Sequence, residues 1–238
     1  KQDRAFITRI CEGVVEYKLQ LDYIVDQYSN TPIAKCKPVI RNILRMGVYQ
    51  IKYMNGIPDT AACNEAVKLA KKRKFVNLSG FVNGVLRNIA RGIDNINYPD
   101  ERLNPNKYLS VYYSTPEWLV DKLVEDYDYA TTKCILESTT VDRGTTIRCC
   151  NYNVDYNELR EKLKANNIVV HHGKYIKDAM IINNYDYVRR IPGFQDGDFV
   201  VQDESSMLVG YIADAKEKDM VLDICAAPGG KTLHIADL

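Results

Sequence analysis

The sequence has no long apolar segment, no cysteines at metal-binding spacing and almost no net charge over its 238 residues. Because a membrane-spanning helix needs about 20 consecutive apolar residues, the sequence predicts none. The first residues, KQDRAFITRI, carry charge throughout and lack the apolar core of a secretion signal. A content of 46% hydrophobic and 26% charged residues is typical of a soluble protein, so we expect a cytoplasmic location.

Cysteine is present, but in no arrangement that indicates a metal centre. The seven cysteines are Cys11, Cys36, Cys63, Cys134, Cys149, Cys150 and Cys225. Without a Cys-x-x-Cys pair or a Cys/His cluster, we expect no metal site, and an odd number of thiols fits a reducing compartment. The adjacent His171 and His172 would point to opposite faces of a strand, which disfavours joint binding of one ion.

The net charge of +1 hides an asymmetry along the chain. Residues 1–95 hold 16 Lys or Arg against 8 Asp or Glu, whereas the remainder holds 16 against 23. A basic part joined to an acidic part indicates two modules, of which the first faces a polyanion. A chain of this length can give each module a core of its own.

Apolar residues that recur every three or four positions predict an all-α bundle in the basic part. The expected helices are one long or two joined helices over residues 3–28, then one from Pro38 to near Gly56, one over about 60–73 and one from Ser79 to Gly92. Ser79 is the expected N-cap of the last of these.

The polar, Asn-rich and Tyr-rich residues 93–113 are expected to form a linker. Ser114-Thr115-Pro116-Glu117 then predicts the start of a helix that runs to about residue 128, with a capping hydroxyl and with Trp118, Leu119 and Leu123 on its apolar face. This helix would connect the bundle to the rest of the chain.

The acidic part reads as a β-α-β-β pattern followed by a further strand and helix. Strands are expected at 144–149, 168–171 and 179–182, with a helix at 155–166; the run 199–203 follows, and then a helix capped by Ser205 or Ser206. The short apolar run 221–225 is consistent with a buried strand.

Residues 220–232, MVLDICAAPGGKT, combine that strand with a glycine turn and the start of a helix. Strand, small-residue loop and helix N-terminus together form a corner suited to a nucleotide-type ligand. A phosphate-binding P-loop would need a glycine five positions before the Gly-Lys pair, where this chain has Cys225. The sequence therefore favours a different cofactor over a nucleoside triphosphate.

The run DICAAPGGKT closely resembles motif I of the S-adenosylmethionine-dependent RNA cytosine-C5 methyltransferases. The segments LRMGVYQIKYM, NEAVKLAKKR and GFVNGVLRNIAR resemble the NusB-like helical domain. That domain occurs alone as a transcription antitermination factor, and also at the N-terminus of the bacterial 16S ribosomal RNA m5C methyltransferases of the Fmu/Sun family. In that family it begins with one or two more helices than this chain shows.

The resemblance implies a multidomain α + α/β protein in four parts. These are a NusB-like helical RNA-binding domain (1–110), a connecting helix (111–130), a small β-α-β-β, RRM-like segment (131–190) and the incomplete start of a Rossmann-like class I methyltransferase domain (191–238). An RRM that reads RNA carries aromatic residues on its strands, and none are evident here. We therefore expect this segment to pack and position.

The implied cofactor is S-adenosyl-L-methionine, and the implied substrate is 16S ribosomal RNA. The residues expected to line the methionine and ribose end of the cofactor are Cys225, Ala226, Ala227, Pro228, Gly229, Gly230 and Lys231. Asp223 is expected to shape this loop by accepting its N–H groups. The less favoured alternative for Lys231 is a solvated lysine of the first helical turn.

Seven basic residues of the bundle could contact RNA phosphates without base specificity. They are Arg41, Arg45, Lys71, Lys72, Arg73, Arg87 and Arg91. The alternative is that they form the ordinary solvated face of a helical bundle, and Lys71 and Lys72 also suit the dipole at a helix C-terminus.

In the family, a cysteine thiolate attacks C6 of cytosine, so that C5 becomes nucleophilic and takes the methyl group. Both family cysteines follow motif I, in Thr-Cys-Pro and Pro-Cys contexts that do not occur in this sequence. We therefore assign no catalytic residue here and do not assign that role to Cys225. The chain by itself is expected neither to methylate RNA nor to hold the cofactor at micromolar affinity.

Two other functions stay open from the sequence. A non-catalytic RNA-binding or antitermination protein would use the NusB-like bundle, but it would not need residues 114–238. A class I methyltransferase that acts on protein or a small molecule would not need the basic helical domain. The sequence leaves the oligomeric state and the modified cytosine open.

Overall fold

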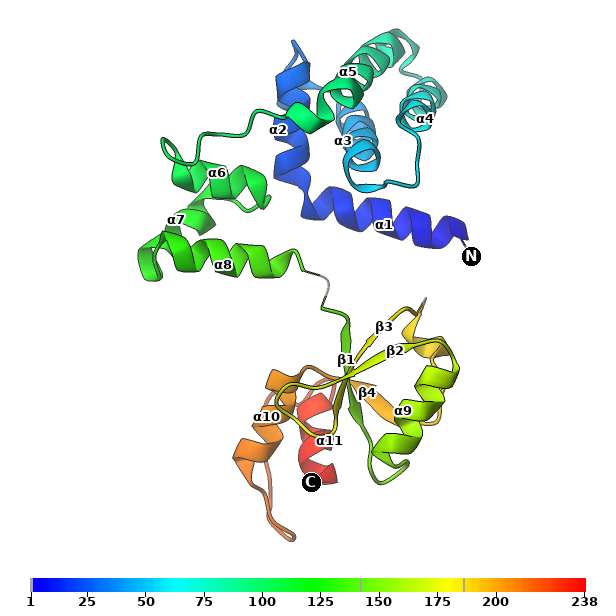
Figure 1. Cartoon of the computed structure of the whole chain (residues 1–238), viewed down its shortest axis with the longest axis vertical. Helices are drawn as coiled ribbons and strands as arrows, with labels where there is room; N and C mark the ends of the chain where they lie inside the picture. Colours follow the sequence, from blue (N-terminus) through cyan, green and yellow to red (C-terminus); the bar gives the residue numbers. More distant parts are fainter. Residues whose placement is uncertain (1, 142, 186) are drawn as a thin grey trace. The chain divides into compact units, whose positions relative to one another are not determined.

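The computed structural model describes residues 2–141, 143–185 and 187–238, which fall into two compact units, 1–141 and 142–238 (Figure 1). The first unit is helical, and the second combines a small sheet with helices. No helix in these described residues is long and apolar enough to cross a membrane.

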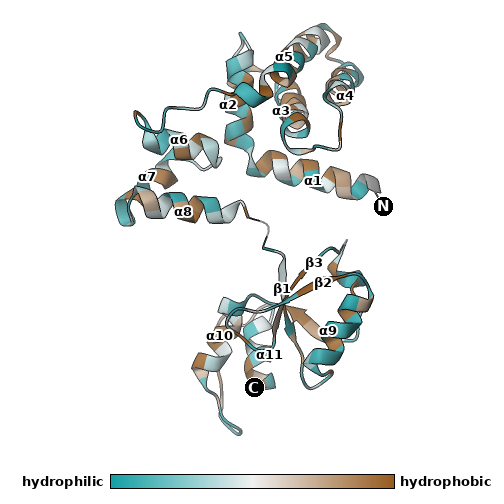
Figure 2. Cartoon of the chain, viewed as in Figure 1, coloured by the Kyte–Doolittle hydropathy of each residue, from teal (hydrophilic) through white to brown (hydrophobic). Residues whose placement is uncertain are grey.

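Five α-helices form the bundle of the first unit, as the apolar periodicity predicts. They are α1 (Gln2–Glu16), α2 (Lys18–Tyr28), α3 (Pro38–Tyr53), α4 (Asp59–Lys72) and α5 (Ser79–Gly92), with single 3-10 turns η1 (Ile33–Lys35), η2 (Val76–Leu78) and η3 (Ile93–Asn95). The expected N-terminal helix is thus two joined helices. Figure 2 shows brown apolar and teal polar residues along the same helices, and Leu21, Leu44 and Leu86 are fully buried in their shared core.

A glycine brings α3 and α5 close together at the centre of this core. A Cβ atom on Gly47 would lie 2.6 Å from Cδ1 of Leu86, far inside van der Waals contact. Gly84, on α5, has no atom within 4 Å of its would-be Cβ. The two positions therefore separate the packing role of a helical glycine from its intrinsic helix propensity.

Three further helices complete the first unit: α6 (Pro105–Tyr112), α7 (Glu117–Asp126) and α8 (Tyr129–Thr139). The expected linker at 93–113 is therefore wrong over its second half, because Pro105 begins a helix that buries Leu109 against Val120 and Leu136. The expected apolar face of α7 is also wrong at Trp118, which is 69% exposed, while Val120 is buried.

Hydrogen bonds from α2 hold α6 and the turn after it. Gln20 Nε2 donates to the carbonyl of Tyr112 at 2.7 Å, and the Leu19 N–H donates to Ser114 Oγ at 3.0 Å. Ser114 thus serves a tertiary contact and does not cap α7, whose N-cap is Pro116. Ser79 likewise differs from its expected capping role, because its hydroxyl donates to the carbonyl of Val76.

The second unit contains one antiparallel sheet in the order β2-β3-β1-β4, with α9 between β1 and β2. Its elements are β1 (Thr145–Cys149), α9 (Tyr156–Ala165), β2 (Val169–His172), β3 (Ala179–Asn183), η4 (Val188–Arg190) and β4 (Phe199–Val201). The predicted β-α-β-β pattern is confirmed. Two elements cross the expected domain boundaries: α8 passes residue 130, and β4 joins the sheet from beyond residue 190.

Alternation along the strands divides the sheet into two faces. Ile147 and Met180 lie with Leu159 and Leu163 of α9 in one core. The intervening residues Arg148 and Ala179 face α10 (Glu204–Ala213) and α11 (Gly230–Asp237), as the contacts to Asp237 and Met207 show. Figure 1 shows α9 on one side of the sheet and α10 and α11 on the other.

The expected strand at residues 221–225 is wrong. Leu222 and Ile224 are 86% and 87% exposed, and no strand among the described residues pairs with this segment. A strand needs a hydrogen-bonded neighbour, and the sheet found among the described residues contains β1 to β4 but not this segment. The helix expected after the glycine turn is confirmed as α11.

The glycine contact between α3 and α5 generates a paired prediction. Gly47→Ala should lower the free energy of unfolding of the chain by about 1–3 kcal/mol, because its methyl group overpacks Leu86. Gly84→Ala should raise it by up to about 1 kcal/mol, because alanine favours an exposed helical position. Urea unfolding followed by circular dichroism measures both, and equal effects of the two substitutions would contradict the close approach.

Candidate functional site

Asp223 organises the glycine loop that leads into α11. Its Oδ1 accepts the N–H of Cys225 at 2.9 Å, and its Oδ2 accepts the hydroxyl of Thr232 at 2.6 Å. The bond from Thr232, and then that from Cys225, hold the pKa of the Asp223 carboxyl below its ordinary value. The carboxylate therefore joins the two ends of the loop, as the sequence predicts for the N–H of Cys225.

The end of the loop is open to a ligand. Gly229 has φ +109°, a left-handed conformation that favours glycine, and a Cβ on Gly230 would meet no atom within 4 Å. The amides of the first turn of α11 have no acceptor within the helix. They can donate to an anionic or carbonyl group, and the dipole of the helix favours negative charge there.

All seven residues expected to bind the cofactor lie on this one segment. Residues 225–228 and Lys231 are exposed, and Gly229 and Gly230 are half-buried. The Cys225 thiol is exposed. Among the described residues, the Lys231 ammonium has no hydrogen-bond or ion-pair partner, so it is available to a ligand.

An ion pair between a buried arginine and a partly exposed aspartate fixes α11 to the sheet. Arg148 is 3% exposed; its NH1 group donates to Asp237 Oδ2 at 2.6 Å, and its Nε donates to Gln202 Oε1 at 2.9 Å. Because Asp237 ends α11 and Gly230 begins it, this contact sets the direction in which the helix meets the loop. Arg148 is not among the residues predicted for the site, although a charged residue between apolar Ile147 and Cys149 is a usable signal of a buried ion pair.

His234 completes this interface on α11. It is 2% exposed, packs edge-on against the ring of Tyr211 at 5.5 Å, and its Nδ1 has no hydrogen-bond partner among the described residues. Burial, followed by the charge of Arg148, lowers the pKa of this imidazole. The histidine is therefore neutral at pH 7 and serves packing here.

A second carboxylate connects α10 to the turn between β2 and β3. Glu204 accepts three backbone N–H groups, from Lys174 at 3.0 Å, Tyr175 at 2.7 Å and Ile176 at 2.8 Å. Burial raises the pKa of this carboxyl, but the three hydrogen bonds together outweigh it, so the pKa lies below its ordinary value of 4.5. Sequence reasoning missed this contact because its partners are backbone groups 28–30 residues away.

The structure corrects one member of the expected RNA-binding set. Arg45 is 9% exposed, and its Nε and NH2 groups donate to the two carboxylate oxygens of Asp22 at 2.6 and 2.7 Å. A guanidinium held in this bidentate pair is not available to phosphate. The other six residues have exposed or half-exposed side chains: Arg41, Lys71, Lys72, Arg73, Arg87 and Arg91.

The two histidines of β2 do not form a metal site. His172 Nδ1 lies 2.7 Å from the hydroxyl of Tyr156, whereas His171 belongs to the opposite face. Within residues 2–141, 143–185 and 187–238, no group of three or more His, Cys, Asp or Glu side chains is arranged to hold a metal ion.

Known proteins are similar in sequence to both units of the chain. The NusB family matches residues 1–91. The whole chain is 37% identical to the probable ribosomal RNA small subunit methyltransferase B of Bacillus subtilis (strain 168), with 100% of this chain and 52% of the relative covered. Its counterpart in Synechocystis sp. is 31% identical, covering 99% of this chain and 53% of the relative.

One further relative and one solved structure are also similar to this chain. Ribosomal RNA small subunit methyltransferase B of Vibrio vulnificus is 30% identical, covering 99% of this chain and 54% of the relative. The crystal structure of PH0851 aligns with a TM-score of 0.74 at 20% identity, covering 98% of this chain and 52% of that one. That likeness shows the fold alone. The chain spans about half the length of the curated relatives it matches.

The ion pair between Arg148 and Asp237 generates a prediction about α11. Arg148→Met should lower the free energy of unfolding of the second unit by about 1–3 kcal/mol, because the buried Gln202 loses its hydrogen-bond partner and the partly exposed Asp237 loses its ion pair. It should also speed hydrogen exchange in the peptide that carries α11. Arg160→Met is the matched control, because Arg160 is half-buried and its ion pair with Glu161 is long, at 3.9 Å. We expect this substitution to change the free energy of unfolding by less than about 0.5 kcal/mol. Unchanged exchange in α11 would contradict this role of Arg148.

The lowered pKa of Glu204 generates a prediction about acid stability. A carboxyl with a depressed pKa stabilises the fold above its ordinary value of 4.5, and this contribution is lost as the pH falls below that value. Glu204→Gln should cost about 2 kcal/mol at pH 7, because a charged acceptor of three N–H groups is removed. The variant should also lose less stability than the wild type between neutral and acidic pH. Urea unfolding at several pH values measures this, and parallel pH profiles would contradict it.

Proposed function

We propose that this chain belongs to an RNA methyltransferase. It is similar throughout its length to ribosomal RNA small subunit methyltransferases B, and the NusB family matches residues 1–91. The observation that carries the proposal is the Asp223-ordered glycine loop, set at the N-terminus of α11 in a chain that also carries the NusB-like bundle. The proposed substrate is ribosomal RNA of the small subunit, and the proposed location is the cytoplasm.

S-adenosylmethionine is the proposed cofactor, and the residues present fit it. The cofactor supplies an electrophilic methyl group. The first-turn amides of α11 and the unpaired Lys231 are suited to its carboxylate, and the open space over Gly230 lets the ligand approach the backbone. Asp223 acts indirectly, because its oxygens already accept the N–H of Cys225 and the hydroxyl of Thr232.

The finer proposal is that the product is 5-methylcytosine in 16S ribosomal RNA. By resemblance, a cysteine thiolate adds to C6 of the base, and C5 takes the methyl group from the sulfonium, which leaves as S-adenosylhomocysteine. A second cysteine or another base then accepts the C5 proton, and expulsion of the thiolate from C6 restores the ring. We place that cysteine outside residues 1–238, because none of the seven cysteines follows a threonine or a proline. The four proposed parts keep their order along the chain, but the boundary at residue 130 moves to about 141, where the first unit ends, and the boundary at residue 190 moves past β4, which belongs to the sheet.

The bundle is proposed to hold the RNA backbone through Arg41, Lys71, Lys72, Arg73, Arg87 and Arg91. The sheet is proposed to position α11, because the face that carries Arg148 and Ala179 packs against α10 and α11. Its two inner strands, TTIRC and AMIIN, also have no aromatic residue on which a base could stack. This arrangement divides the work between the units: the first binds substrate, and the second orients the cofactor loop.

A non-catalytic RNA-binding or antitermination role is the second candidate, and the NusB match over residues 1–91 favours it. The ordered loop and the Arg148 interface count against it, since neither contributes to RNA binding by the bundle. The two candidates differ in whether a methyl group is transferred.

Methyl transfer tests the proposed function. The gene product, at its full encoded length, is incubated with unmodified small-subunit ribosomal RNA and S-adenosylmethionine labelled in the methyl group. We expect label in the RNA, recovered as 5-methylcytidine after digestion to nucleosides. Asp223→Ala should lower cofactor affinity by about tenfold or more, because loss of its two hydrogen bonds releases the loop. RNA binding without any transfer would contradict the proposal and favour the second candidate.

A further inference from the structure

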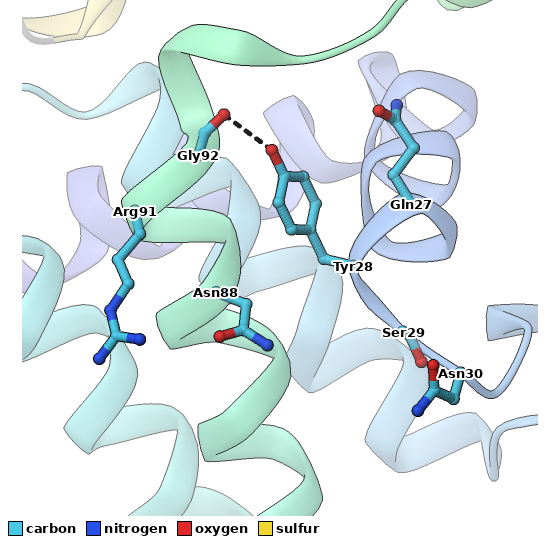
Figure 3. A pocket seen from close by; sticks show the side chains of 7 residues that line it. All are labelled: Gln27, Tyr28, Ser29, Asn30, Asn88, Arg91 and Gly92. Atoms are coloured by element: carbon cyan, nitrogen blue, oxygen red, sulfur yellow. Dashed lines mark hydrogen bonds between the residues drawn. The ribbon is translucent and has the colours of Figure 1, made fainter.

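The ends of α2 and α5 border a hollow that has no role so far. Its volume is about 460 Å³, within the range of roughly 300–1,000 Å³ that is common for small-ligand sites. The lining residues are Gln27, Tyr28, Ser29, Asn30, Asn88, Arg91 and Gly92. Figure 3 shows Asn88 on α5 directed toward the segment that carries Ser29 and Asn30.

One side of the hollow is held by a contact between α2 and α5. The hydroxyl of Tyr28 donates to the carbonyl of Gly92 at 2.8 Å, which joins α2 to the end of α5 (Figure 3). A Cβ on Gly92 would lie 2.2 Å from that hydroxyl oxygen, so the close contact requires glycine. The backbone that borders the hollow is therefore ordered by this contact, while the exposed side chains of Asn30, Asn88 and Arg91 line its open surface.

The chemistry of the lining is that of a hydrogen-bonding site without acid groups. Asn30 and Asn88 each present a carboxamide donor and acceptor, whereas the oxygen of the third carboxamide, Gln27, already accepts the N–H of Asn97 at 3.1 Å; no carboxylate lines the hollow. The side chains of Asn30, Asn88 and Arg91 have no hydrogen-bond or ion-pair partner in the described part of the chain. Their bonding capacity is therefore available to a ligand.

The electrostatics distinguish a base from a bare anion. The hollow lies at the carboxyl end of α5, where the helix dipole carries partial negative charge and favours hydrogen-bond donors such as exocyclic amino groups. Positive charge stands beside it, because Arg87 and Arg91 are exposed one turn apart on α5, a helix without any Asp or Glu. A neutral base in the hollow suits the negative end of the helix dipole, and a phosphate beside Arg87 and Arg91 suits their positive charge.

From these features we propose that the hollow holds one unpaired base of an RNA strand, hydrogen-bonded by Asn30 and Asn88, with the attached phosphate at Arg91. Recognition of unpaired bases through their polar edges is the usual route to sequence preference in RNA binding. The inference rests on the proposed RNA-binding function and extends it, because the basic residues alone give affinity without base preference.

Affinities for short single-stranded oligoribonucleotides of one base each test the proposal. The 238-residue chain and its variants are titrated against labelled oligo(A), oligo(U) and oligo(C) by fluorescence anisotropy, at several salt concentrations. Circular dichroism confirms that each variant is folded. The wild type should rank the three bases, and Asn88→Ala should weaken the best-bound oligonucleotide about 5-fold or more and reduce the differences between bases. Asn30→Ala should act in the same direction.

Matched controls separate the hollow from general effects. Asn64→Ala removes the same group from an exposed position on α4, and it should leave both affinity and ranking unchanged. Arg91→Gln should weaken all oligonucleotides alike and reduce the slope of log affinity against log salt by about 0.7, the value for one phosphate contact on a single strand. Arg102→Gln removes one exposed charge elsewhere and should change the slope less.

The outcomes distinguish this inference from the function on which it rests. If the wild type binds RNA but Asn88→Ala and Asn30→Ala keep both its affinity and its base ranking, the base-binding hollow is refuted and the basic surface stands. If Arg91→Gln behaves like Arg102→Gln, the phosphate placement is refuted. If the wild type binds none of the oligonucleotides even at low salt, RNA binding by this bundle is refuted together with the hollow.

Discussion

The ion pair between Arg148 and Asp237 is the contact on which the placement of the glycine loop depends. It crosses from the centre of the sheet to the end of α11, while Asp223 and Thr232 join the loop to the start of the same helix. Loop, helix and sheet are thereby connected through two short polar contacts, although the loop itself is exposed. The pair specifies one arrangement, because the buried Arg148 guanidinium would be left without its charged partner if α11 moved away, whereas Asp237 is partly exposed to water.

The polar contacts of the second unit share a division of labour. Carboxylates hold backbone and hydroxyl groups: Glu204 fixes the turn between β2 and β3, and Asp223 fixes the loop. The face of the sheet that carries Arg148 and Ala179 is covered by α10 and α11, so this face is not free to bind RNA through stacked bases. Groups that could contact a ligand directly, the first-turn amides of α11 and the Lys231 ammonium, lie outside these networks, whereas the amide of Cys225 is already held by Asp223. This separation keeps the binding groups available while the groups that place them are already satisfied.

In the first unit, charge is distributed between structure and surface. Arg45 and Asp22 form a bidentate pair against the core, whereas Lys71, Arg87 and Arg91 keep their charges in water. The surplus of positive charge is therefore largely presented outward, where it can meet a phosphate backbone. The polar hollow between α2 and α5 adds what charge alone lacks, namely directional donors and acceptors next to that surface.

The sequence alone determined the helices of the bundle, the β-α-β-β order and the glycine loop, because apolar period, proline, glycine and a ten-residue motif are local signals. Tertiary structure decided which side chains each element could use. Arg45 pairs with Asp22, and Ser114 accepts the N–H of Leu19, so that both side chains bind partners distant in sequence. Trp118 is exposed, although the sequence predicts it on an apolar face. The apolar run at residues 221–225 is exposed because a strand exists only where another strand pairs with it, and no spacing within the run can supply that neighbour.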